Sequence, residues 1–241
     1  MMRRLISLFY VAVWVLPIFG AQVANFENDE NVKSNQVLSR YKNNSVVFLK
    51  NDSFFIAELD SRGKIVNAAY TTDFDRIQPE GQFAYSEKSG ELYYVNGGKL
   101  FKAKQRKSGK WVNSAYIEVK GSEVKRDKYP GSVLAYANWR YLPKDSIVIV
   151  NPTINSQGDV LYFSSNMNNV KSRDIWEMSK DQNGEWGNPV RLDASVNTVD
   201  ADEDFPFVND EGMLVFASNR GNASHSDSTY RLFSKSEPVD Y

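Results

Sequence analysis

The most constraining feature of this sequence is an internal repeat with a period of 46 residues. Residues 63–70 (GKIVNAAY) return as residues 109–116 (GKWVNSAY), with six of the eight positions identical. The register holds upstream, where the apolar residues of 46–48 correspond to those of 92–94, and the motif comes back a third time at 184–186. A period in the forties that is made of short apolar runs is typical of the blades of a β-propeller.

Turn residues recur at matching places in the units. Gly158 and Gly212 each end a tight turn between a first and a second apolar run. Glycine there supplies a positive φ angle, and Gly90 fills the same place in the second unit. Asn44 stands at this place in the first unit, because asparagine also tolerates the left-handed region. The turn chemistry therefore agrees with the hydrophobic period.

The strands of each unit can be predicted from the same pattern. Pro152 and Pro206 are expected to open first strands, on the inner edge of a blade, where a missing N–H is tolerated. Third strands are expected at 174–178 and 229–233. Fourth strands are expected to begin at the Gly-x-Trp motif and its equivalents, namely at residues 63–65, 109–111 and 184–186.

These patterns predict an all-β fold, a β-propeller of four recognisable four-stranded blades, or of five if an insertion contributes one. The predicted units are about 36–75, 78–120, 148–198 and 202–241, with the insertion at 121–147. The fourth unit holds only three predicted strands, so both a closed ring and an incomplete ring stay open. Because an unpaired strand edge invites pairing with another chain, self-association is also an open possibility.

Composition removes several classes of function. The 241 residues carry 29 basic and 30 acidic side chains, a net charge of −1 that gives no broad attraction for nucleic acid. The chain has no cysteine and a single histidine, His225, so disulfides and the usual zinc sites are not expected. His225 lies in a Ser- and Asn-rich stretch without an evident catalytic partner. We predict no metal site and no cofactor.

The first 35 residues carry the signal for the compartment. A basic start at Met1–Arg4 precedes an apolar stretch over 5–20 and a small-residue region, an order typical of a secretory signal peptide over 1–24. The alternative is an uncleaved anchor, although the apolar run is shorter than the ~20 residues of a bilayer span. Residues 25–35 are polar and are interpreted as a tether. We expect a periplasmic or secreted protein without an integral membrane span after cleavage.

The last two units resemble a known repeat family. Pro152 and Gly158 lead into Leu-Tyr-Phe-Ser-Ser-Asn, then Asp-Ile-Trp at 174–176, then Gly-x-Trp-x-x-Pro-Val-x-Leu from Gly184. This series resembles the TolB-type, WD-like β-propeller repeat of bacterial envelope proteins. The resemblance is good over 148–241 and reaches 36–119 only through the internal repeat. It implies a non-catalytic scaffold that binds an envelope protein, a peptide or a peptidoglycan-associated, cell-wall partner.

The insertion is the predicted binding region. It stands on the propeller face that also carries the loops between second and third strands, and it contains Tyr136, Trp139, Arg140 and Tyr141. Tyr, Trp and Arg are the side chains most able to anchor a partner. The alternative is that residues 133–136 and 147–150 form the strands of a degenerate extra blade, with these aromatic side chains in its core.

Two further segments contain residues that could carry chemistry. Residues 179–186 approach the Asp-box of sialidase-like propellers, with glycine one position late. Such boxes stabilise turns, and this one is the basis of the alternative function, a secreted glycan-binding or glycan-cleaving, sialidase-like propeller; the glycan-cleaving form would be a glycoside hydrolase. No catalytic residue can be named, however, and we predict that the protein is not an enzyme. The acidic residues 200–204 could offer oxygen ligands to Ca²⁺, but they match no EF-hand spacing, and a solvated acidic loop is the preferred interpretation.

Overall fold

The computed structural model describes residues 36–120, 147–168, 172–209, 211–221 and 231–236. These residues form fifteen β-strands and no α-helix. The strands make four small antiparallel sheets, and each sheet uses strands that are consecutive in the chain. The predicted all-β fold class is confirmed.

The strand bounds are as follows. The first sheet, blade 1, contains β1 (Gln36–Tyr41), β2 (Ser45–Lys50), β3 (Ser53–Leu59) and β4 (Ile65–Thr71). Blade 2 contains β5 (Ala84–Ser86), β6 (Glu91–Asn96), β7 (Lys99–Gln105) and β8 (Trp111–Tyr116). Blade 3 contains β9 (Ile149–Ile154), β10 (Val160–Ser165), β11 (Asp174–Ser179) and β12 (Val190–Arg191). Blade 4 contains β13 (Glu203–Val208), β14 (Met213–Ser218) and β15 (Arg231–Ser236).

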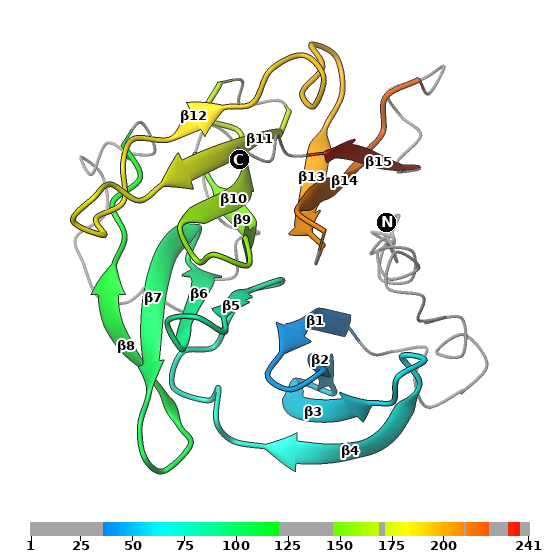
Figure 1. Cartoon of the computed structure of the whole chain (residues 1–241), viewed down its shortest axis with the longest axis vertical. Helices are drawn as coiled ribbons and strands as arrows, with labels where there is room; N and C mark the ends of the chain where they lie inside the picture. Colours follow the sequence, from blue (N-terminus) through cyan, green and yellow to red (C-terminus); the bar gives the residue numbers. More distant parts are fainter. Residues whose placement is uncertain (1–35, 121–146, 169–171, 210, 222–230, 237–241) are drawn as a thin grey trace, which may run out of the picture.

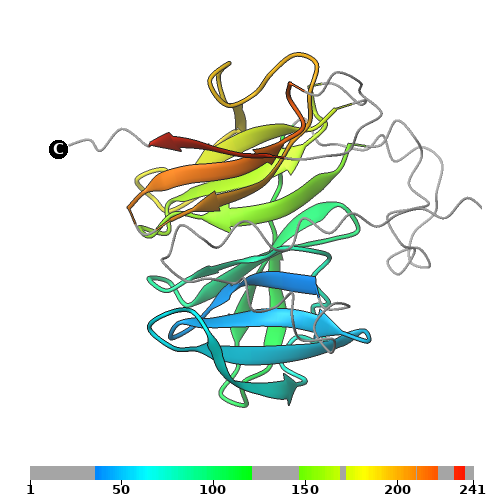
Figure 2. The same ribbon diagram turned by 90° about the vertical axis from the view of Figure 1, so that its right-hand side faces the viewer.

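The four blades surround a common centre, as in a β-propeller (Figure 1). The first strands, β1, β5, β9 and β13, lie nearest this centre, and the chain moves outward strand by strand within each blade. Seen from the side, blades 1 and 2 fill one half of the molecule and blades 3 and 4 the other (Figure 2). In the described part of the chain β15 is an edge strand, paired only with β14.

Turn geometry follows the sequence prediction. Gly90, Gly158 and Gly212 have φ angles of 64°, 73° and 76°, and Asn44 adopts the same region with a φ of 58°. The turn at 155–158 is further fixed by the Asn155 side chain, whose Oδ1 accepts the backbone N–H groups of Asp159 and of Val160, the first residue of β10. Local residue choice therefore specifies these hairpins without contacts from another blade.

The two predicted strand-opening prolines lie elsewhere than expected. Pro152 and Pro206 are inside β9 and β13, each directly after a residue with a φ of 52°, Asn151 or Phe205. The pairing register shifts at both places, which marks a β-bulge. Because a bulge leaves a residue outside the ladder, the missing N–H of proline removes no strand-to-strand hydrogen bond there.

The fourth strand of blade 3 is the second departure. Strand structure was expected from Gly184, but Gly184 ends a turn that begins at Asp181, and the only pairing of residues 184–186 is an isolated bridge between Lys180 and Trp186. The N–H of Gly187 then donates to Ser179 O at 2.9 Å, and Pro189 has no N–H to give. The ladder resumes only as the two-residue strand β12.

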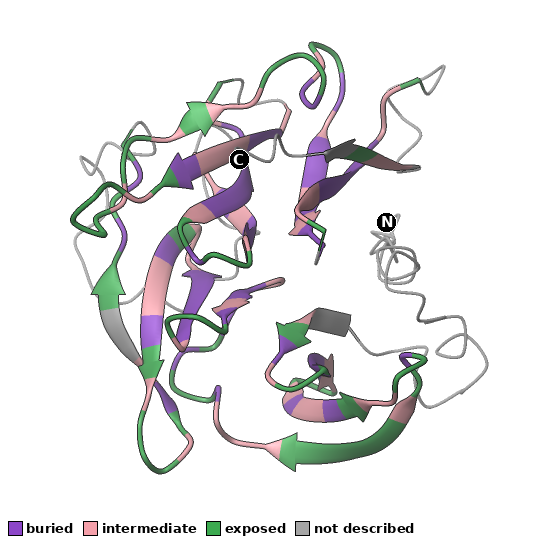
Figure 3. Cartoon of the chain, viewed as in Figure 1, coloured by how far each residue is buried: buried purple, intermediate pink, exposed green. Residues whose placement is uncertain are grey.

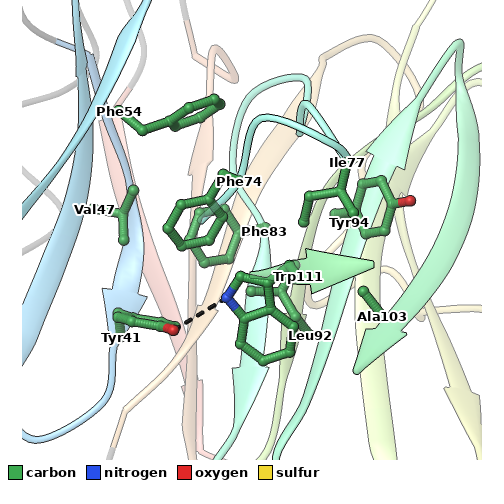
Figure 4. Close-up of a cluster of buried hydrophobic side chains, with 10 residues drawn as sticks. All are labelled: Tyr41, Val47, Phe54, Phe74, Ile77, Phe83, Leu92, Tyr94, Ala103 and Trp111. Carbon is green, nitrogen blue, oxygen red and sulfur yellow. Dashed lines mark hydrogen bonds between the residues drawn. The ribbon is translucent and has the colours of Figure 1, made fainter. Parts of the chain in front are cut away.

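The core is divided into junctions between consecutive blades. Side chains alternate between the two faces of a strand. Second strands such as β6, β10 and β14 are buried on both faces, because each blade packs against its neighbours. The outer strand β4 is mostly exposed (Figure 3). The junction of blades 1 and 2 contains Tyr41, Val47, Phe54, Phe74, Ile77, Phe83, Leu92, Tyr94, Ala103 and Trp111 (Figure 4). The junction of blades 2 and 3 contains Ala84, Tyr93, Val95, Leu100, Ile117, Val119, Ile149, Leu161, Phe163 and Met178. The junction of blades 3 and 4 contains Tyr162, Ile175, Val196, Val208, Leu214 and Phe216.

Several predicted segments lie outside the described residues. These are the signal peptide over 1–24, the tether over 25–35 and the insertion apart from Ile147. Within the ranges that the structure does describe, no helix is long and apolar enough to cross a membrane.

Candidate functional site

The four residues predicted to bind a partner belong to a segment that the structure does not describe. Tyr136, Trp139, Arg140 and Tyr141 all fall within 121–146. His225 is likewise outside the described residues. The structure places the two ends of the insertion, and the role of its aromatic side chains stays a prediction.

Both ends of the insertion are anchored in one junction. Ile117 and Val119, which precede it, are 5 % and 1 % exposed, and Ile149, which follows it, is 1 % exposed. All three pack in the apolar cluster between blades 2 and 3. The N–H of Val148 also donates to the side-chain Oδ1 of Asn166 at 2.8 Å. The segment 121–146 therefore leaves and re-enters a well-packed frame.

The extra-blade interpretation loses one of its two predicted strands. Residues 149 and 150 are the start of β9, the innermost strand of blade 3, where Val150 pairs with Ser164. They belong to a recognised blade because the strand continues past the bulge at Asn151, which sequence alone does not reveal.

The acidic segment 200–204 is not a solvated loop throughout. Glu203 is fully buried, and its Oε1 accepts hydrogen bonds from Ser218 Oγ at 2.8 Å and Thr198 Oγ1 at 2.9 Å. Arg220 Nη2 lies 3.1 Å from the same oxygen. A buried carboxylate needs a counter-charge and hydrogen-bond donors, and the fourth blade supplies both through Ser218 at the end of β14 and Arg220, two residues later.

Asp204 and two neighbouring polar side chains tie three blades together near the centre. Asp204 on β13 is 2 % exposed and forms an ion pair of 2.8 Å with Arg173. Its Oδ1 accepts a hydrogen bond from Asn151 Nδ2 of β9 at 2.8 Å. Gln82, just before β5, donates through Nε2 to Pro206 O at 2.8 Å. These polar side chains near the centre therefore form hydrogen bonds and an ion pair between blades.

These acidic residues do not assemble a cation site. Among the residues that the structure describes, no group of three or more His, Asp or Glu side chains is placed to hold a metal ion. The two most buried carboxylates of 200–204, Glu203 and Asp204, each face an arginine. An arginine beside a carboxylate competes with any cation for its oxygens, so the Ca²⁺ interpretation has no support in these contacts.

The Asp-box-like segment stabilises its own turn. Asp181 Oδ1 accepts the backbone N–H groups of Asn183 and Glu185, each at 2.9 Å. These bonds hold the pKa of the Asp181 carboxyl below its usual range, and the bond from Glu185 has the largest effect. Asp60 makes the same pair of bonds to Arg62 and Lys64 in blade 1. The recurrence in two blades indicates a structural turn motif.

An aromatic cage at the junction of blades 1 and 2 was not anticipated. The ammonium Nζ of Lys42 lies 5.2 Å from the ring centroid of Tyr41, 5.5 Å from that of Tyr85 and 5.3 Å from that of Trp111. The three rings are steeply inclined to one another, at 58° (Tyr41 and Tyr85), 68° (Tyr41 and Trp111) and 71° (Tyr85 and Trp111). We call these three rings the Lys42 cage.

Hydrogen bonds fix the walls of the Lys42 cage. Trp111 Nε1 donates to the hydroxyl of Tyr41 at 3.1 Å, as the dashed line in Figure 4 shows. Gln105 Nε2 approaches the same hydroxyl at 3.4 Å, and its Oε1 accepts a hydrogen bond from Lys42 Nζ. Burial raises the pKa of Tyr41 to about 12, against the opposing effect of the Trp111 donor. Two of the three walls are therefore rigid core residues.

A second lysine lies over aromatic rings at the junction of blades 2 and 3. Lys180 Nζ is 4.8 Å from the centroid of Trp186 and 5.8 Å from that of Tyr93. It also donates to Gly158 O at 2.8 Å and contacts the Tyr93 hydroxyl at 3.2 Å. The Lys180 ammonium is held by a backbone carbonyl and lies near two aromatic rings, whereas the Lys42 ammonium lies near three rings.

The sequence pattern singles out one of the three rings of the Lys42 cage. Trp111 stood out in the Gly-x-Trp repeat, but as a packing residue. Tyr41 and Tyr85 come from β1 and β5, the innermost strands of different blades, so only the packing of blade 1 on blade 2 brings them to Trp111. No local pattern encodes such a meeting.

No protein-family model and no curated protein matches the sequence. Among solved structures, TolB from Acinetobacter baumannii is similar over 83 % of this chain and 39 % of its own, with a TM-score of 0.40 and 9 % identity. Native arabinanase Arb43A from Bacillus subtilis is similar over 74 % of this chain and 65 % of its own, with a TM-score of 0.34 and 10 % identity. Prolyl oligopeptidase B from Galerina marginata is similar over 79 % and 24 %, with a TM-score of 0.32 and 11 % identity.

These likenesses are weak. The chain spans about two fifths of the length of TolB, and all three TM-scores are below 0.5. They assign the chain to none of these proteins.

Proposed function

We propose that the protein is a non-catalytic binding scaffold of the cell envelope, which recognises a protein, peptide or peptidoglycan-associated partner through the insertion on one propeller face. The proposal includes a periplasmic or secreted location, based on the pattern of residues 1–24. Tyr136, Trp139, Arg140 and Tyr141 are the proposed anchors.

The observation that carries the proposal is the anchoring of the insertion. Ile117, Val119 and Ile149 fix both of its ends in the apolar cluster between blades 2 and 3. Binding residues are often found on segments that a rigid frame positions, and this frame is held by packing on both sides of the segment. The aromatic and arginine content of the segment is that of an interface anchor.

The frame itself offers a reason to prefer binding over chemistry. Asp204 and Asn151 of the innermost strands, and Gln82 just before β5, are used in ties between blades. Asp181 of the Asp-box-like turn is used in its own loop. These side chains act within the fold, so the proposed recognition rests on the insertion.

The direct test is capture of envelope material by the tagged protein lacking residues 1–24. Replacing Trp139 and Arg140 with Ala should weaken capture by at least ~2 kcal/mol, about thirtyfold, if they are anchors. The matched control replaces Tyr70 and Tyr116, aromatic residues on the outer strands that are 60 % and 50 % exposed, and should leave capture unchanged.

Thermal unfolding must accompany the capture assay. If the Trp139 and Arg140 replacements lower the melting temperature by several degrees, these side chains belong to a packed core, and the insertion forms part of an extra blade. If both variant pairs weaken capture equally, the partner does not recognise the insertion. Retention of labelled peptidoglycan rather than protein would identify a cell-wall partner, and cleavage of a glycan would refute the non-catalytic proposal.

A further inference from the structure

The Lys42 cage has the form of a cation-binding site. Three rings from three strands, β1, β5 and β8, surround one position, and each is inclined to the others by 58° or more. Cations are attracted to the faces of Trp and Tyr rings within about 6 Å of the ring centre, and quaternary ammonium groups are recognised by such cages. Here the position is taken by the ammonium of Lys42.

The distances leave room for a larger cation than a lysine ammonium. Lys42 Nζ stands 5.2–5.5 Å from all three ring centres, toward the outer part of the ~6 Å range. Methyl groups on a nitrogen at this position would extend toward the rings and contact them. A primary ammonium instead leaves this space to its N–H groups, one of which is donated to Gln105 Oε1.

The charges around the cage favour a cation. Asp73 and Glu87 both attract the Lys42 ammonium. Burial nevertheless lowers the pKa of Lys42, so its ammonium is stabilised less by the cage than by water. A quaternary ammonium has a weaker hydration shell to lose and cannot lose its charge by deprotonation.

Lys42 can leave the cage without a change of fold. It lies in the turn between β1 and β2, and its backbone carbonyl accepts the N–H of Ser45 at 3.1 Å. The turn is held by backbone geometry, with Asn43 and Asn44 at φ angles of 50° and 58°. Only the flexible four-carbon side chain has to rotate into solvent.

We propose that Tyr41, Tyr85 and Trp111 form a binding site for a quaternary ammonium group, such as a choline-type or trimethylated amine, and that the Lys42 side chain competes with the ligand for this site. The site lies at the junction of blades 1 and 2 and is independent of the proposed role of the insertion.

The test is an NMR titration of the chain lacking residues 1–24 with choline, following the choline methyl signal by saturation transfer and the indole N–H signals of the protein. Lys42→Ala should bind choline at least about tenfold more tightly than the unchanged protein, because the competing ammonium is gone. In the Lys42→Ala background, Tyr85→Leu should abolish binding, since Tyr85 is a half-buried wall whose loss leaves the core in place.

Two controls separate cation recognition from simple burial. The neutral isostere 3,3-dimethylbutan-1-ol has the same shape as choline without its charge, and it should bind Lys42→Ala at least about tenfold more weakly. Lys180→Ala makes the same charge change at the two-ring position beside Trp186 and should not improve choline binding.

The proposal is overturned if Lys42→Ala binds choline no more tightly than the unchanged protein, if the neutral isostere binds equally well, or if Lys180→Ala gives the same gain. If Lys42→Ala fails to fold, Lys42→Gln removes the charge while keeping a side chain of similar reach. An absence of improved choline binding in a folded Lys42→Gln has the same meaning.

Discussion

The junction of blades 1 and 2 and the junction of blades 3 and 4 perform the same task with different chemistry. The first is filled by aromatic rings, among them Phe54, Phe74 and Phe83, which pack with centroid distances of 5.4 Å. The second has a smaller apolar cluster and is bordered by ion pairs of a buried carboxylate with a partly exposed arginine, Glu203 with Arg220 and Asp204 with Arg173. The repeat in the sequence therefore specifies the blades and leaves their contacts free to differ.

The difference has an energetic consequence. An aromatic junction is stabilised by removing rings from water, and each ring contributes through its area. A buried ion pair gives little net stability, because the cost of desolvating two charges offsets their attraction, yet removing one partner is costly. The first junction should respond to lost volume, and the second to an unbalanced charge.

The largest effect is expected in the aromatic junction. Trp111→Ala should lower the free energy of unfolding by about 4–5 kcal/mol, because the side chain is fully buried and its removal leaves a cavity. Trp111→Phe keeps most of the ring volume and should cost clearly less. Denaturant unfolding of both variants checks this, and equal losses would mean that the hydrogen bond from Trp111 to Tyr41, rather than the volume, holds the junction.

The ionic junction gives the next largest effect. Glu203→Ala should cost about 3–4 kcal/mol, because it leaves Arg220 near a buried site without its carboxylate. The double replacement of Glu203 and Arg220 by Met should cost less than Glu203→Ala alone, since no unpaired charge remains. A double variant as unstable as the sum of its two single variants would contradict this, because additive losses mean that the two side chains have no interaction energy with each other.

The intermediate junction of blades 2 and 3 can be tested through one turn. Gly158 has a φ of 73°, and a Cβ atom there would come within 2.7 Å of Ser86 Oγ of blade 2. Gly90 has a φ of 64° and nothing within 4 Å of such an atom. Both Ala variants incur the left-handed cost of about 1–2 kcal/mol. Gly158→Ala should lose a further ~1 kcal/mol, measured by chemical denaturation, unless Ser86 rotates away, in which case the two losses are equal.

The contrast between junctions also explains what the sequence could and could not predict. The all-β propeller, the turn glycines and Asn44 follow from local residue choice, which the 46-residue period makes visible. The bulges at Asn151 and Phe205, and the shortening of β12 after Pro189, depend on hydrogen bonds between strands and shift the elements by a few residues.

The contacts between blades are harder to foresee than the blades. The acidic run at 200–204 suggested a solvated loop, but Glu203 and Asp204 find Arg220 and Arg173, which lie far from them in sequence. The Lys42 cage likewise combines residues of two blades. A periodic pattern describes which face of a strand is buried, and it carries no information on which neighbour covers that face.

The smallest effect distinguishes the junctions by pH. Burial raises the pKa of Tyr41 to about 12 in the aromatic junction, above the value of about 10 for an exposed tyrosine. A pKa raised on folding gives stability that is complete well below pH 10 and is lost as the pH rises through about 10 toward 12, because the unfolded chain ionises first. The free energy of unfolding should therefore begin to fall between about pH 9.5 and 10.5.

Tyr41→Phe should be less stable at pH 7 by about 1 kcal/mol, through loss of the Trp111 hydrogen bond. It should also show a shallower alkaline decline, measured by denaturant unfolding at each pH. An identical decline in Tyr41→Phe would show that Tyr41 does not cause the alkaline sensitivity and would assign it to other tyrosines whose pKa burial raises, such as Tyr94 of the same junction.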